Sequence, residues 1–117
     1  MVSNHQQGFV RAWHAHKKEA KYVTVVSGAA MVGTVYVECW ENPNMIHQSI
    51  APKVEKFILS EKKPAVLYIP PGYANGFKTL APNTKLIFYS TSTLEDSKND
   101  DYRFRYDTWH IWDIEQR

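Results

Sequence analysis

Two histidines and three cationic side chains lie close together near the start of the 117-residue chain. The histidines are His14 and His16, and the cations are Arg11, Lys17 and Lys18. On a β-strand, residues two apart share a face, so His14 and His16 point the same way and Arg11 points the other way unless a bulge re-aims it. Histidine is the usual general base near neutral pH. We interpret the stretch as a strand that meets an anionic ligand, although a partly buried polar face would give the same spacing.

The elements that must position these residues are strands. Runs rich in β-branched and aromatic residues alternate with turn signals at intervals of about 8–12 residues, and no stretch has a helical period. The pattern predicts an all-β barrel or sandwich in one domain over residues 1–117, with a loose N-terminus at 1–7 and a Gly33 that could mark a bulge. The expected strands cover 9–16, 21–26, 29–39, 46–50, 54–59, 65–69, 73–80 and 85–91, before an aromatic stretch at 102–112. The polar run 97–101 is expected to be a solvated loop.

Composition narrows the function classes. The formal net charge is +2 and no stripe of basic and aromatic residues is present, so no nucleic-acid partner is expected. Cys39 is the only cysteine, which excludes an intrachain disulfide and a thiolate metal cluster, and which fits a cytoplasmic location. No run approaches the roughly 18 apolar residues of a membrane span, and the polar N-terminus lacks the apolar core of a signal peptide.

Two motif blocks resemble those of the cupin superfamily, whose fold is a small β-jelly roll or double-stranded β-helix. The first is Gly8, five residues, then His14-Ala15-His16 and Glu19; the second is the sequence IPPGYANGF at 69–77. More narrowly, most of residues 8–112 is similar to the nucleotide-sugar cupins, the dTDP-4-dehydrorhamnose 3,5-epimerases. The matching segments are 11–14, 21–28, 70–77, 106–108 and 111–113. The sequence HAHK also resembles a sister family, the dTDP-sugar 3,4-ketoisomerases.

The resemblance implies a reaction and a set of roles. Both families begin by removing a proton α to the C4 ketone of a nucleotide-linked 4-keto-6-deoxy sugar. The resemblance assigns His14 as the base, Asp107 as the carboxylate that orients it, and Lys21 as the cation that stabilises the enolate. Lys21 could instead be a solvated lysine at a strand edge, and Asp107 could cap a turn. The expected substrate-binding residues are Arg11, His16, Asn75 and Tyr89. A homodimer, no cofactor, and a place in deoxysugar or polysaccharide biosynthesis are also implied.

The chain departs from the epimerase pattern at several positions. Ala12 replaces a glycine, and Asn75 replaces the histidine of the second motif. The tyrosine pair that supplies the acid in the epimerases is missing, and Tyr89 is the nearest phenol. The chain also begins just before the first motif, so the N-terminal segment of the epimerases is expected to be missing.

These departures leave several reactions open. A double epimerisation needs an acid opposite the base, so the alternatives are a single-site epimerase, a ketoisomerase that uses His14 and His16 as two proton carriers, and a non-catalytic binder of sugars or nucleotides. A metal-dependent cupin is disfavoured because Glu19 lies closer to His16 than the superfamily pattern expects, and because Asn75 is a poor third ligand. We therefore expect no metal site.

Overall fold

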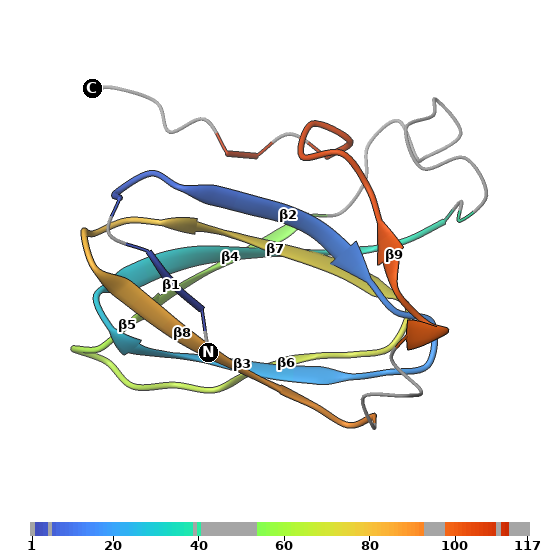
Figure 1. The fold of residues 1–117 in the computed structure, drawn as a ribbon, viewed down its shortest axis with the longest axis horizontal. Helices are drawn as coiled ribbons and strands as arrows, with labels where there is room; N and C mark the ends of the chain where they lie inside the picture. Colours follow the sequence, from blue (N-terminus) through green and yellow to red (C-terminus); the bar gives the residue numbers. More distant parts are fainter. Residues whose placement is uncertain are drawn as a thin grey trace.

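In the part of the chain that the structure describes, nine β-strands form two antiparallel sheets that pack face to face (Figure 1). The structure is a computed structural model that describes residues 2–4, 6–38, 40, 54–92, 98–109 and 111–112. The four-stranded sheet has the order β1 (Val2–Asn4), β8 (Thr84–Ser90), β3 (Lys21–Ser27) and β6 (Leu67–Ile69). The five-stranded sheet has the order β5 (Glu55–Ser60), β4 (Ala29–Tyr36), β7 (Tyr73–Thr79), β2 (Val10–Ala15) and β9 (Tyr102–Arg103). The expected all-β jelly roll is confirmed.

The main core lies between the two sheets. Alternation along β3 sends Val23 and Val25 inward, where they are buried, and leaves Tyr22 and Val26 exposed on the outer face. The inward side chains pack with Val32, Leu59, Ile69, Phe77 and Leu86 from the neighbouring strands. Each such side chain contributes about 1.5–3 kcal/mol through burial, so the two sheets are held at a fixed separation.

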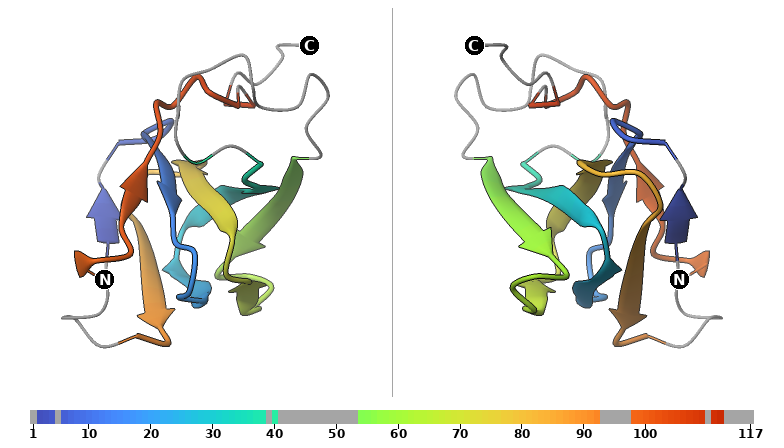
Figure 2. Two further views of the ribbon diagram at one scale, coloured as in Figure 1. Left: turned by 90° about the vertical axis from the view of Figure 1, so that its right-hand side faces the viewer. Right: turned by 90° about the vertical axis from the view of Figure 1, so that its left-hand side faces the viewer.

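A second core covers the outer face of the five-stranded sheet, beneath the C-terminal segment (Figure 2). Trp13 of β2 is fully buried there, with ring centroids 5.5 Å from Trp109 and 5.0 Å from Trp112. Its indole Nε1 donates a hydrogen bond to the carbonyl of Tyr106, and its backbone exchanges two hydrogen bonds with Phe104. Strand β2, which carries the histidine motif, is therefore anchored in the second core.

Two expectations are corrected. Residues 2–4 are not loose, because β1 pairs antiparallel with β8, and a short polar segment can do this through its backbone alone. Gly33 marks no bulge, since it pairs in regular register with Lys56 and Gly76. The expected strand at 46–50, together with Cys39, lies outside the described residues. None of the described residues forms a helix long and apolar enough to span a membrane.

Candidate active site

A bulge in β2 decides which side chains meet. Arg11 pairs with Phe77 and His14 pairs with Asn75 on β7. Two residues separate Arg11 from His14, but only Gly76 separates their partners, so β2 carries one extra residue. Because of this, Arg11 and His14 line the same cavity even though they are three residues apart.

The bulge depends on close packing of two backbones. A Cβ added to Gly76 would lie 2.5 Å from the Cβ of Ala12 and 3.0 Å from the Trp112 ring, so a side chain there would push β2 away. The adjacent residue, Trp13, turns to the opposite face and anchors the bulge in the second core. The motif is thus held by packing rather than by polar contacts alone.

The first cavity, of about 210 Å³, lies between the sheets. Its walls come from β2 and β7 on one side and from β3 and β8 on the other: Arg11, His14, Asn75, Phe77, Lys21 and Phe88. Four of these are residues that the sequence predicted for the site. Cross-strand neighbours on β2 and β7 and the inward residues of β3 and β8 therefore converge as expected for a jelly roll.

A second cavity, of about 280 Å³, shares His14 and Lys21 with the first. Its other walls are His16, Glu19, Lys98, Asp101 and Arg103. The first cavity has aromatic rings in its wall, whereas the wall of the second is made mostly of charged side chains.

The electrostatics of the pocket make His14 a neutral imidazole at physiological pH. Burial, followed by the positive charges of Arg103, Lys21 and Arg11, lowers the pKa of His14 from 6.5 to about 4, while the charge of Asp101 opposes the shift. A neutral imidazole can accept a proton from a bound ligand. The surplus of cations around it favours a ligand that is anionic or that becomes anionic during reaction.

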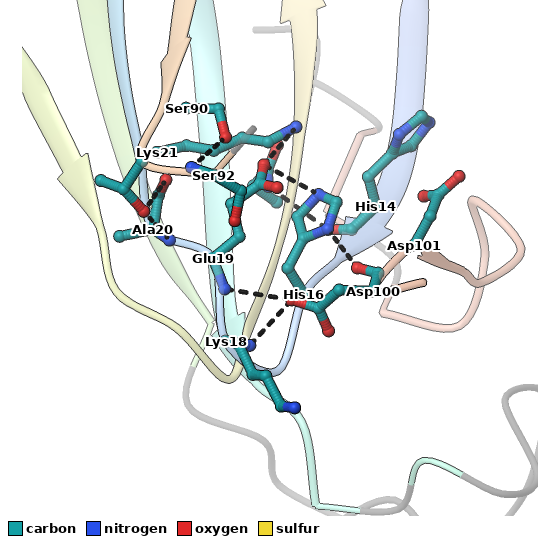
Figure 3. A network of polar contacts seen from close by, with 12 residues as sticks. His14, His16, Lys18, Glu19, Ala20, Lys21, Ser90, Ser92, Asp100 and Asp101 are labelled. Carbon is teal, nitrogen blue, oxygen red and sulfur yellow. Dashed lines mark hydrogen bonds and ion pairs between the residues drawn. The ribbon is translucent and has the colours of Figure 1, made fainter. Parts of the chain in front are cut away.

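His16 does not face the first cavity. It is 6% exposed, and its Nδ1 donates a hydrogen bond to the backbone carbonyl of Asp100. Its Nε2 lies 3.7 Å from the buried carboxylate of Glu19, which in turn lies 3.8 Å from Nζ of Lys21 (Figure 3). The two histidines of the motif therefore have different surroundings despite their shared parity.

The loop after β2 is held by Asp100. The carboxylate of Asp100 accepts hydrogen bonds from the backbone N–H groups of residues 17, 18 and 19, at 2.8, 2.9 and 3.1 Å. Burial alone would raise the pKa of Asp100, but these three donors and the nearby His16 outweigh it and lower the pKa. The run 97–101 was predicted to be a solvated loop, and at Asp100 that prediction is wrong. An acidic run with no apolar period gives no signal for such a role.

Two predicted site residues lie elsewhere. Asp107 is exposed and accepts two hydrogen bonds of 3.0 Å from Arg105, so the expected pairing with His14 is corrected. The carboxylate that acts on His14 is that of Asp101, which lies beside it in Figure 3. Tyr89 is 57% exposed on the outer face of β8, so it does not line either cavity.

Three predictions from the sequence concern groups expected to be absent from the site: a tyrosine acid, a metal site and the second-motif histidine. Among the described residues that line the two cavities, none is a tyrosine. The described part of the chain also contains no group of three His, Cys, Asp or Glu side chains placed to hold a metal ion. Asn75, in the position of the family's second histidine, donates through Nδ2 to the carbonyl of His14 at 3.3 Å.

Comparison with known proteins identifies the family of the chain and relates its fold to solved structures. A family model described as dTDP-4-dehydrorhamnose 3,5-epimerase matches residues 1–112. No curated protein matches the sequence. Solved structures of the same fold include two dTDP-4-dehydrorhamnose 3,5-epimerases. The one from Bacillus anthracis, with TDP and PPi bound, is 21% identical with a TM-score of 0.74, and the match covers 98% of this chain and 64% of that one.

The second, from Sulfolobus tokodaii, is 26% identical with a TM-score of 0.70, and the match covers 95% of this chain and 61% of that one. ChmJ, a 3'-monoepimerase from Streptomyces bikiniensis solved with dTDP-quinovose, is 19% identical with a TM-score of 0.68, covering 87% of this chain and 48% of that one. This chain thus spans less than two thirds of the length of each of these three proteins.

Proposed function

Because the chain belongs to the dTDP-4-dehydrorhamnose 3,5-epimerase family, we propose that it epimerises a nucleotide-linked 4-keto-6-deoxy sugar. The observation that carries the proposal is the convergence of His14, Lys21, Arg11 and Asn75 on one cavity. The reaction would proceed by proton abstraction α to the ketone, within deoxysugar or polysaccharide biosynthesis.

His14 is the proposed base. Its burial and its cationic neighbours keep the imidazole neutral, so that it is ready to take a proton from carbon. Asp101, whose charge opposes those cations, is the proposed partner that stabilises the imidazolium once it forms. Asp101 replaces Asp107 in this role because its charge acts on His14, whereas Asp107 is exposed and pairs with Arg105.

Lys21 is the proposed stabiliser of the enolate. Lys21 lines both cavities, so its ammonium group can reach a ketone oxygen that becomes negative there. A fixed positive charge in a partly buried pocket lowers the energy of such an oxyanion more than water does. In this proposal His14 accepts the proton, and Lys21 stabilises the negative charge on the enolate oxygen.

The remaining residues bind the substrate. Arg11 and Arg103 present guanidinium groups suited to the oxygens of a diphosphate. Asn75 is placed to hydrogen-bond a hydroxyl or the ketone of the sugar. Phe77 and Phe88 form the apolar wall of the first cavity, against which a sugar ring can pack.

A 3,4-ketoisomerase is the second candidate, and one observation favours it. His14 and His16 both line the second cavity, as a reaction with two proton carriers requires. Against it, His16 is almost fully buried and its Nδ1 is engaged by a backbone carbonyl. A non-catalytic sugar- or nucleotide-binding cupin is the third, because no tyrosine is present among the described residues that line the cavities.

Deuterium exchange separates these candidates. The protein is incubated with dTDP-4-keto-6-deoxyglucose in D₂O, beside a sample without protein, and the sugar protons are followed by NMR. We expect exchange at C3, at C5 or at both, with a product of inverted configuration at the exchanged carbon. A product with its ketone moved to C3 would instead identify a ketoisomerase. Binding without any exchange would refute the enzymatic proposal and leave a binding protein.

We further propose that residues 1–117 form one cupin domain that works as a homodimer in the cytoplasm, without a metal or an organic cofactor. The proposed dimer is supported by the outer face of the four-stranded sheet. Tyr22, Tyr68 and Tyr89 lie there on paired strands and are 40, 49 and 57% exposed. Exposed aromatic patches of this kind are typical of protein interfaces. Light scattering after gel filtration measures the mass, and a monomer would contradict the proposal.

A further inference from the structure

Glu19 is a buried carboxylate that the proposed reaction does not use. Its side chain is only 2% exposed, at the end of the loop between β2 and β3. Carboxylates are rarely buried to this extent unless a partner offsets the loss of hydration. Glu19 Oε2 lies 3.8 Å from Nζ of Lys21 and 3.7 Å from Nε2 of His16. Figure 3 shows the carboxylate between these two groups.

The backbone around Glu19 is fixed. Its N–H donates to the carboxylate of Asp100 at 3.1 Å, as do the two preceding N–H groups at 2.8 and 2.9 Å. Bonds to a charged acceptor are among the stronger hydrogen bonds in proteins. The loop therefore presents the Glu19 side chain from a rigid base.

His16 packs against the carboxylate from the other side. Because a carbonyl oxygen only accepts, Nδ1 of His16 carries the hydrogen that is donated to Asp100, and this bond sets the orientation of the ring. The opposite nitrogen, Nε2, is buried and has no hydrogen-bond partner among the described residues. It faces Glu19, so the imidazole ring closes off that side of the carboxylate.

The group whose position this arrangement fixes is the ammonium of Lys21. Its side chain is 20% exposed and has a flexible four-carbon stem that could turn toward solvent. Its ammonium instead lies beside Glu19, 5.9 Å from the centre of the Phe88 ring, at the wall shared by the two cavities. A charge held in place before reaction stabilises a developing oxyanion better than one that must first be ordered.

We propose that Glu19 is a positioning residue, whose buried carboxylate, backed by His16 and anchored through Asp100, holds the ammonium of Lys21 at the cavity wall. The inference rests on the proposed function for its catalytic consequence, because Lys21 matters to catalysis only if an enolate forms. Its structural content, the immobilisation of Lys21, does not depend on any reaction.

The first test therefore uses the protein without substrate. Selective ¹³C labelling of lysine Cε and NMR relaxation report how far each lysine side chain moves, with the Lys21 signal assigned by its loss in Lys21→Met. We expect Lys21 to be restricted in the wild-type protein, unlike the exposed Lys62, and to become mobile in Glu19→Gln. The control is Glu55→Gln, at an exposed position on β5. A wild-type Lys21 as mobile as Lys62 would overturn the inference even if Glu19→Gln failed to fold.

The second test uses turnover. If the exchange reaction occurs, Glu19→Gln should lower kcat by about 10- to 100-fold with little change in KM, because substrate contacts remain while the charge is no longer held in place. Glu19→Asp, which keeps the charge, should recover part of the loss. A Glu19→Gln enzyme with wild-type kcat would also overturn the inference. Absence of exchange in the wild-type protein would refute the proposed function alone, because the relaxation experiment still decides whether Glu19 fixes Lys21.

Discussion

The pH dependence of exchange tests whether His14 works as a neutral base. Its pKa is lowered from 6.5 to about 4 by burial, then by Arg103, Lys21 and Arg11. At pH 5 an imidazole with a pKa of about 4 is roughly 90% neutral, whereas one with the ordinary pKa of about 6.5 is roughly 3% neutral. We therefore expect kcat/KM for deuterium exchange to be nearly constant from neutral pH down to pH 5 and to halve only near pH 4.

A substitution at Arg103 tests the same prediction by a direct measurement of the pKa of His14. Arg103 exerts the largest charge effect on His14, so Arg103→Met should raise the pKa of His14 and move the fall in kcat/KM to higher pH. Arg105→Met is the control, because Arg105 lies on the same segment and is engaged by Asp107. The titration of His14 is followed by the NMR shift of its ring protons. An apparent pKa near 6.5 in the wild-type protein, or one unmoved by Arg103→Met, would refute the reasoning.

Three further substitutions test other parts of the account. Lys21→Met should lower kcat for exchange by about 100- to 1,000-fold through loss of the oxyanion charge, and wild-type turnover would exclude Lys21 from the chemistry. Asp100→Ala should lower the free energy of unfolding by about 2–4 kcal/mol at pH 7 by leaving backbone donors of the loop unpaired, as measured by urea denaturation. Since the pKa of Asp100 is lowered on folding, its contribution is lost as the pH falls through that pKa, and the variant should lose less stability in acid than the wild type. Gly76→Ala should cost about 1–3 kcal/mol by pressing on Ala12, and Ala12→Gly in the same chain should restore part of it; an unchanged melting curve would contradict the packing described at the bulge.

Local sequence signals predicted most of the fold. β-Branched and aromatic runs gave the main strands, and the alternation of Val23 and Val25 with Tyr22 and Val26 gave the inner and outer faces. Local signals could not predict β1, because three residues without a clear alternation become a strand only by pairing with β8. The bulge in β2 also depends on a distant partner, since it appears only when Gly76 lets β7 approach Ala12.

The candidate site was predictable where motif residues lie on strands. Arg11, His14, Lys21 and Asn75 reach one cavity because strand pairing brings their segments together. The charged residues that surround His14 and Lys21 were not predictable, because they lie in a loop and in the C-terminal segment. Asp101 in place of Asp107 changes which carboxylate supports the base, and no pattern of spacing could show that Asp107 turns to Arg105 instead.

The central claim is that His14 removes a proton from a bound sugar nucleotide. The most direct measurement compares the rate of deuterium incorporation from D₂O into dTDP-4-keto-6-deoxyglucose by the wild-type protein and by His14→Asn, with both saturated with ligand as shown by calorimetry. General-base catalysis predicts a loss of at least about 100-fold in His14→Asn with binding retained. Equal rates in the two proteins at equal occupancy would contradict the account, because the proton would then be leaving to a group other than His14.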